Sequence, residues 1–165
     1  MKIFITGNSG CGKSFIANKL SKEHNIKICS LDNLVWKNNL KRSYEERENL
    51  LNDFLLKNNS WVIEGMSHNN WMHEVYKQAD HIFILKTSNF LAKTRIIKRF
   101  IKKKLGIEKG HKETLKSLKN LFKIRKEYQE NIMPEIIENL KIYNDKTNEV
   151  KNYKQIKKII TDFNR

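Results

Sequence analysis

The stretch GNSGCGKS, residues 7–14, most restricts what this chain can fold into. It fits the pattern G-x-x-x-x-G-K-S/T, in which glycines let a loop bring several backbone N–H groups close to a phosphate chain. The apolar run KIFIT (2–6) before it predicts a buried strand, and the apolar spacing from Lys13 to Lys22 predicts a helix. Strand, loop and helix in this order predict a phosphate loop at a helix N-terminus, where the helix dipole favours an anion.

Strands and helices alternate along the rest of the chain. Further strands are expected at IKICS (26–30), WVIEG (61–65), HIFIL (81–85) and, more weakly, NEVKN (148–152). Helices are expected at 43–57, 70–78, 90–104, about 113–143 and 153–163. Ser43 and Glu46 have the spacing of a capping box, and Pro134 is expected to interrupt or restart the long helix. This alternation predicts a three-layer α/β fold, a parallel sheet with helices on both faces.

Length and composition fit one domain covering residues 1–165. There is no linker rich in glycine or serine and no internal repeat. No apolar run approaches the roughly 20 residues that span a bilayer, and the N-terminal MKIFITG is too short for a secretory signal. We therefore expect a cytoplasmic protein without a membrane partner, in which Cys11 and Cys29 are reduced thiols.

Positive charge is concentrated in the second half of the chain. The formal net charge is +15, and residues 93–126 hold 14 Lys or Arg against Glu108 and Glu113, a local net charge of +12. Such a segment attracts polyanions, either nucleotide phosphates or a nucleic acid backbone. The alternative interpretation is a compositional bias toward lysine, asparagine and isoleucine through the whole chain, which explains the total charge more readily than the clustering.

The phosphate loop and two carboxylates predict a site for a triphosphate and a metal ion. Lys13 would place its charge on the β- and γ-phosphates, and Ser14 would offer its hydroxyl to Mg²⁺. Asp32 and Glu64 each follow or end a predicted strand, and the carboxyl ends of parallel strands meet at one crevice. Either carboxylate could hold Mg²⁺ through water, and Asp32 could also accept the proton of an acceptor hydroxyl.

Arginine on the basic helix adds charge beside this crevice. Arg95 and Arg99 lie four residues apart, so they share one side of the helix and could stack on a base and bind phosphates. The segment 102–125 is expected to form a short basic lid, and Arg125 is one of the cations that could close over the transferred group. The alternative interpretation of these arginines is an ordinary solvated face.

The aromatic residues and histidines need different interpretations. Trp61 and Trp71 are expected to pack in the core, whereas Trp36, in LDNLVWK after Asp32, could line a pocket for the phosphoryl acceptor. His68 and His73 have no cysteine or histidine partner at the spacing of metal ligands, so no zinc site is expected.

The glycine loop, LDNLVWK, WVIEG, ADHIFILK and RIIKRF occur in the order found in the adenylate kinase-like P-loop kinases. Among these, the chain most resembles the bacterial topology modulation proteins, over roughly residues 1–105. The resemblance implies a monomer with a five-stranded parallel sheet in the order 2-3-1-4-5 and a mobile lid after the fourth helix. It further implies that ATP binds at residues of the loop and of the basic helix: Gly7, Asn8, Ser9, Gly10, Cys11, Gly12, Lys13, Ser14, Phe15, Arg95 and Arg99.

The acceptor side departs from the adenylate kinase pattern. Glu64-Gly65 stands where adenylate kinases carry Asp-Gly, but Met66, Ser67 and His68 replace the Phe-Pro-Arg that follows it there. The acceptor arm, residues 33–60, is also short, with Arg42 and Arg47 as the candidates to bind an acceptor phosphate. ATP as donor is therefore better supported than AMP as acceptor.

Two functions remain open at this point. The first is an ATP- and Mg²⁺-dependent kinase of the nucleoside monophosphate kinase-like class, with Lys13, Asp32, Arg95 and Arg99 as catalytic residues and a nucleotide or other small molecule as acceptor. The second is a nucleotide-dependent regulator that binds DNA or RNA through residues 93–126 and affects DNA topology. The sequence shows no nucleic-acid reading motif, which favours the kinase.

Overall fold

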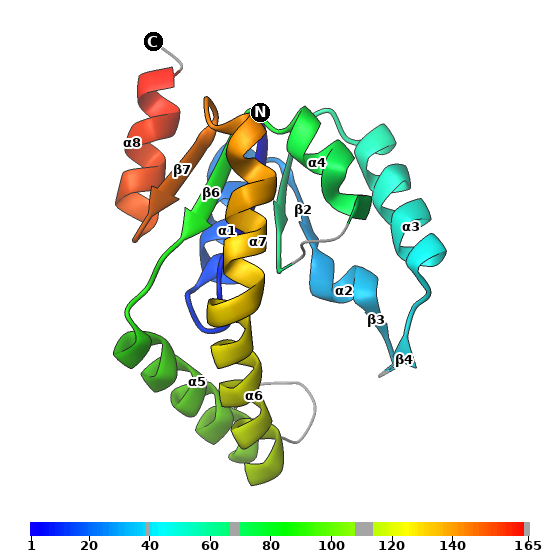
Figure 1. Cartoon of the computed structure of the whole chain (residues 1–165). Helices are drawn as coiled ribbons and strands as arrows, with labels where there is room; N and C mark the ends of the chain where they lie inside the picture. Colours follow the sequence, from blue (N-terminus) through cyan, green and yellow to red (C-terminus); the bar gives the residue numbers. More distant parts are fainter. Residues whose placement is uncertain (39, 67–69, 108–113, 164–165) are drawn as a thin grey trace.

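The computed structural model describes residues 1–38, 40–66, 70–107 and 114–163, arranged around one parallel sheet (Figure 1). The strands are β1 (Lys2–Thr6), β2 (Lys27–Ser30), β5 (Trp61–Glu64), β6 (His81–Leu85) and β7 (Thr147–Val150). They pair in the order β2-β5-β1-β6-β7, and every pair is parallel. Numbered along the chain within this sheet alone, this is the expected order 2-3-1-4-5.

Helices cover both faces of the sheet, which confirms the three-layer α/β class. On one face α1 (Lys13–His24) and α8 (Tyr153–Phe163) pack against Ile3 and Ile5 of β1. On the other face α3 (Tyr44–Lys57), α4 (His73–Gln78) and α7 (Met133–Leu140) share a core with Phe4. Successive side chains of a strand point to opposite faces, so the uninterrupted apolar run of β1 serves both cores.

The helices α5 (Asn89–Lys104) and α6 (Leu115–Glu127) contact each other beyond the carboxyl ends of the strands (Figure 1). The helix α5 begins where the Ser88 hydroxyl accepts a hydrogen bond from Leu91 N, and the chain turns at Gly106, whose φ is 73°. The predicted lid, 102–125, therefore comprises the end of α5 and most of α6; its residues 108–113 lie outside the described residues.

The restart expected at Pro134 is present, because α7 (Met133–Leu140) begins there, but the helical column is not broken. The helix α6 continues through a π-helical turn, η2 (Tyr128–Ile132), into α7, and η3 (Lys141–Tyr143) follows as a 3-10 turn. Figure 1 shows this segment as one long column of helix. Pro134 lies in the first turn of α7, where its missing N–H and its fixed φ are tolerated.

The acceptor arm contains elements that the sequence did not indicate. After β2 the chain forms a short helix, α2 (Leu31–Val35), and a small hairpin of β3 (Trp36–Lys37) and β4 (Leu40–Lys41). Asp32 therefore lies in a helix and not directly at the end of a strand. The capping box of Ser43 and Glu46 is present at the start of α3, as predicted.

Two tryptophans and both cysteines lie as the sequence predicted. A 3-10 turn, η1 (Asn70–Met72), precedes α4, and Trp61 and Trp71 are buried in the core. Cys11 and Cys29 are buried free thiols. Within the described ranges, no helix is long and apolar enough to cross a membrane.

Candidate phosphate-binding site

The phosphate loop, residues 7–14, joins β1 to α1 and runs in close contact with its neighbours. A Cβ atom on Gly7 would lie 2.5 Å from the Leu85 carbonyl oxygen, and one on Gly10 would lie 2.8 Å from that of Ala92. Gly10 also has a φ of 77°, in the left-handed region that other residues rarely adopt. Glycine is thus required here by both space and backbone conformation.

Only part of the backbone of this loop is used within the protein. Ser9 N donates to the Asn8 side-chain oxygen at 2.7 Å, and Cys11 N donates to the Asn8 carbonyl at 3.3 Å. In the described part of the chain, no acceptor faces the N–H groups of Gly10, Gly12, Lys13 and Ser14. These groups lie in the loop and the first turn of α1, and they are donors available to an anion.

Three cations bind the loop by its carbonyl oxygens. Lys13 Nζ donates to Gly7 O at 2.9 Å and to Asn8 O at 3.3 Å. Arg95 Nη1 donates to Cys11 O at 2.8 Å, and Arg125 Nη1 donates to Ser9 O. The carbonyls of residues 7, 9 and 11 therefore each accept a hydrogen bond from a positive charge.

Ser14 and Glu64 come together as the sequence suggested. The Ser14 hydroxyl donates to Glu64 Oε1 at 3.2 Å across 50 residues of chain. Glu64 is 4% exposed at the end of β5, opposite Ile5 of β1 and Ser30 of β2. A hydroxyl and a carboxylate beside a phosphate loop fit Mg²⁺, which takes one or two protein oxygens and fills its other positions with water and phosphate. Among the described residues, no group of three or more His, Cys, Asp or Glu side chains could hold a metal ion.

The other residues proposed from sequence lie around this centre at greater exposure. Asp32 is exposed on α2, two residues after Ser30, which pairs with Glu64. Trp36 is 51% exposed at the start of the hairpin. Phe15 is exposed on the first turn of α1, and Arg99 is exposed on α5, one turn beyond Arg95.

Arg42 and Arg47, the expected acceptor-binding residues, both bind the backbone of the acceptor arm. Arg42 Nη1 donates to Asn33 O at 2.7 Å and to Leu34 O at 3.0 Å, which closes the end of α2. Arg47 is 5% exposed, its Nε donates to Arg42 O at 3.0 Å, and its guanidinium lies 4.8 Å from the centre of the Tyr44 ring.

Sequence reasoning missed how Arg125 and Asn89 join the loop. Arg125 is 5% exposed, its Nη2 donates to Asn89 Oδ1 at 2.9 Å, and its own carbonyl accepts from Asn8 Nδ2 at 2.9 Å. Burial lowers the pKa of this guanidinium. A cavity of about 370 Å³ lies beside these residues, with Thr87 and Gln129 also in its wall. The one available signal was that Arg125 is the only arginine among the lysines of α6.

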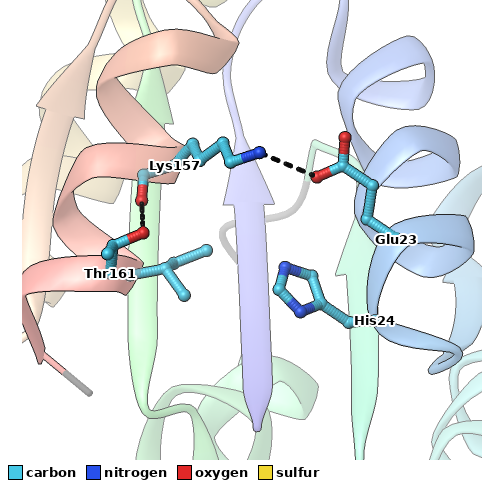
Figure 2. A pocket seen from close by; sticks show the side chains of 5 residues that line it. Glu23, His24, Lys157 and Thr161 are labelled. Carbon is cyan, nitrogen blue, oxygen red and sulfur yellow. Dashed lines mark hydrogen bonds and ion pairs between the residues drawn. The ribbon is translucent and has the colours of Figure 1, made fainter. Parts of the chain in front are cut away.

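A second cavity, of about 310 Å³, lies between the C-terminal end of α1 and α8 (Figure 2). Lys157 Nζ and the Glu23 carboxylate face each other across it at 3.9 Å, beside His24. The hydrogen bond from the Tyr153 hydroxyl is the main cause of the lowered pKa of Glu23. Because α1 has 12 residues, roughly 18 Å separate this cavity from the phosphate loop.

Comparison with known proteins finds a likeness in fold. No protein-family model and no curated protein matches the sequence. An uncharacterized protein from Eubacterium ventriosum has a similar solved structure, with a TM-score of 0.55 and 16% identity, over 99% of this chain and 97% of that one. A gluconokinase from Sinorhizobium meliloti gives a TM-score of 0.50 and 13% identity, over 91% and 81%. A shikimate kinase from Bacteroides thetaiotaomicron gives a TM-score of 0.47 and 18% identity, over 59% of this chain and 63% of that one. The chain has a kinase-like P-loop fold.

Proposed function

We propose that this protein is an ATP- and Mg²⁺-dependent kinase that transfers the γ-phosphoryl group to a small molecule. One observation carries the proposal: loop N–H groups that have no acceptor within the described residues lie in the same short segment as Lys13 and as Ser14, which bonds Glu64 at the end of β5. Each of these groups matches one part of a magnesium triphosphate, namely the phosphate oxygens, their negative charge and the metal ion.

Lys13, Ser14 and Glu64 would divide the work of phosphoryl transfer. Lys13 would exchange the Gly7 and Asn8 carbonyls for the β- and γ-phosphates and neutralise charge in the transition state. Ser14 and Glu64 would hold Mg²⁺ and its water, and the ion would supply further charge neutralisation. Arg95 and Arg99 would lie against the base and phosphates, and Asp32 would accept the proton of the acceptor hydroxyl.

The acceptor arm favours a hydroxylated acceptor that is not bound by a phosphate of its own. Arg42 and Arg47 donate to backbone carbonyls, and Met66 follows Gly65 where an adenylate kinase-like protein has Phe. The exposed ring of Trp36 and the carboxylate of Asp32, both suited to a polyol or another small metabolite, lie on the same short segment. The fold it shares with a gluconokinase agrees with such an acceptor. We also propose that the protein is a cytoplasmic monomer.

The test is phosphoryl transfer from γ-labelled ATP to a panel of nucleoside monophosphates, sugar acids, polyols and other metabolites. We expect Mg²⁺-ATP to raise the melting temperature of the wild type and Lys13→Ala to lose most of that shift. A wild type that is stabilised by no nucleotide would show that the loop does not bind phosphate, and the kinase proposal would fail. Label transferred to a nucleoside monophosphate alone would contradict the acceptor class.

A second candidate function is a regulator that binds nucleic acid, in line with the resemblance to topology modulation proteins. Lys116, Lys119 and Lys123 line an open hollow of about 690 Å³ on α6, together with Asn120. Such a surface would bind the phosphate backbone without reading sequence. Affinity for duplex DNA should then fall steeply between low and physiological salt, and no binding at low salt would exclude this function.

A further inference from the structure

We propose that Arg125 is a positioning residue of the phosphate loop: by holding the Ser9 carbonyl, it aims the Gly10 N–H at the nucleotide. The inference rests on the proposed nucleotide binding, and it assigns Arg125 a different role from the lid cation that the sequence suggested. A lid cation touches the transferred phosphate, whereas a positioning residue acts through the loop backbone.

The geometry of the peptide bond links the two sides of the loop. In a trans peptide the C=O of one residue and the N–H of the next point in opposite directions, and the described chain has no cis peptide. A donor that fixes Ser9 O therefore directs Gly10 N–H to the other side. Because the donor is charged, the bond is strong and polarises the peptide, which makes that N–H a better donor.

The same arrangement recurs at alternate peptides of the loop. Arg125 holds Ser9 O and Arg95 holds Cys11 O, with Thr87 Oγ1 adding a second bond to Cys11 O at 3.2 Å. Lys13 contacts Gly7 O in the same way, but it would leave this carbonyl for the phosphates. The peptides fixed by the two arginines carry the N–H groups of residues 10 and 12. The N–H groups that precede them, of Ser9 and Cys11, are bonded to Asn8. The N–H groups of Ser9 and Cys11 are thus used within the loop, whereas those of Gly10 and Gly12 remain available to a ligand.

Arg125 is held in place as a fixed part of this arrangement. Asn89, at the start of α5, accepts from Nη2 at 2.9 Å, and Asn8 Nδ2 bonds the Arg125 carbonyl at 2.9 Å. Loop and helix therefore each donate a side-chain hydrogen bond to the backbone of the other. With 5% exposure, the guanidinium is buried against the carbonyl side of the loop, opposite the face that would receive phosphate.

Binding of ADP and ATP distinguishes positioning from direct contact. The loop N–H groups surround phosphates that ADP and ATP share. Arg125→Gln should therefore weaken both ligands by a similar factor of about tenfold or more, the loss expected for one charged hydrogen bond. A direct contact to the γ-phosphate would instead weaken ATP alone. Lys126→Gln is the matched control, because it removes the same charge from the adjacent, exposed position of α6 and should change neither affinity.

A spectroscopic signature separates positioning from simple loss of structure. The chain has six glycines, so protein labelled with ¹⁵N-glycine gives six backbone amide signals. In the ligand-free protein, Arg125→Gln should move the Gly10 signal and leave those of Gly65 and Gly106 in place. Arg125→Lys keeps the charge but loses the fork, so it should give a smaller shift and recover part of the ADP affinity.

Each outcome decides the matter. Equal weakening of ADP and ATP with a displaced Gly10 signal supports the inference. Loss of ATP affinity alone, unchanged affinities, or equal shifts of all glycine signals would overturn it. A wild type that binds neither nucleotide defeats the proposed function instead, and because the Gly10 signal is measured without ligand, that failure is distinguishable from failure of the inference.

Discussion

The phosphate loop and the acceptor arm use the same bond with opposite consequences. In both, a guanidinium donates to a backbone carbonyl: Arg125 to Ser9 in the loop, and Arg47 to Arg42 in the arm. In the loop, the bonded peptides leave N–H groups that the proposed phosphate ligand would use. In the arm, the arginines themselves were the groups expected to bind a ligand, and they are occupied. The hydrogen bonds of these arginines, more than their charges, therefore support the loop over the arm as the proposed phosphate-binding region.

Gly10→Ala should give the largest effect, and it tests whether the conformation of the phosphate loop is needed for ATP binding. The new Cβ would lie 2.8 Å from Ala92 O, and the alanine would have to keep the backbone φ of 77°. The loop must therefore shift. We expect about a 100-fold loss of ATP affinity in a titration, from overpacking added to backbone strain.

The matched control for this variant is Gly106→Ala. Gly106 has a similar φ of 73°, but a Cβ there meets nothing within 4 Å. We expect a loss of about 1 kcal/mol in the free energy of unfolding, from left-handed strain alone, and unchanged ATP affinity. Equal ATP affinities for the two alanine variants would show that contact with α5 does not shape the loop.

Arg47→Met tests the arm side of the comparison. The variant removes a buried guanidinium and leaves Arg42 O without its donor, so the free energy of unfolding should fall by about 2 kcal/mol in urea denaturation. ATP affinity should not change. Lys57→Met, on the exposed side of the same helix, should stay within about 0.5 kcal/mol of the wild type. Loss of acceptor turnover without loss of stability would mean that Arg47 binds the acceptor after all.

Glu64→Gln sharpens the assignment of the metal ion to the loop side. The amide keeps the size of the side chain and can still accept from Ser14, but it lacks the charge that attracts Mg²⁺. The affinity of the ATP complex for Mg²⁺ should fall by about tenfold, which is the smallest loss usually seen when a residue that orients metal ligands is replaced. ADP binding in EDTA should be unaffected. A variant that needs no additional Mg²⁺ would exclude Glu64 from the metal site.

Tyr128→Phe should give the smallest change in the free energy of unfolding at neutral pH. It concerns a buried residue that contacts Thr6, just before the phosphate loop. Tyr128 is fully buried, its hydroxyl lies 3.5 Å from Thr6 Oγ1, and burial raises its pKa to about 12. A raised pKa stabilises the fold below about pH 10, and this contribution is lost as the pH rises toward 12. The variant should therefore lose less stability than the wild type over this interval of a pH-dependent unfolding series. Equal slopes would contradict a neutral, buried hydroxyl at this position.

Patterns within a few residues predicted most of the fold. The five strands, the helix caps and the P-loop depend on local spacing, and parallel strands brought Ser14 and Glu64 together without further information. The hairpin of β3 and β4 was missed because its strands have two residues each, too short for an alternation to show. The π-helical turn before Pro134 was missed because it is a shift of hydrogen-bond register inside a continuous helix, and no residue type encodes it.

The roles of arginine could not be predicted, because a guanidinium reaches several acceptors from one backbone position. Arg125 bonds Ser9 across 116 residues, and nothing near either residue indicates the pairing. Two arginines close together in the sequence, such as Arg42 and Arg47, are typical of a phosphate-binding site. Their carbonyl partners are set by the path of the chain through α2 and the hairpin, which the sequence does not reveal. Charge could be located from the sequence, but its partners could not.

The exposed Trp36 gives the protein an intrinsic optical probe on the acceptor side. Of its three tryptophans, Trp61 and Trp71 are buried, and only the ring of Trp36, at the hairpin, is open to solvent. Iodide should therefore quench a single emitting class, the one with the red-shifted spectrum. A compound that protects this emission would be recognised as an acceptor before any phosphoryl group has moved, so the missing substrate can be sought by fluorescence in the absence of ATP.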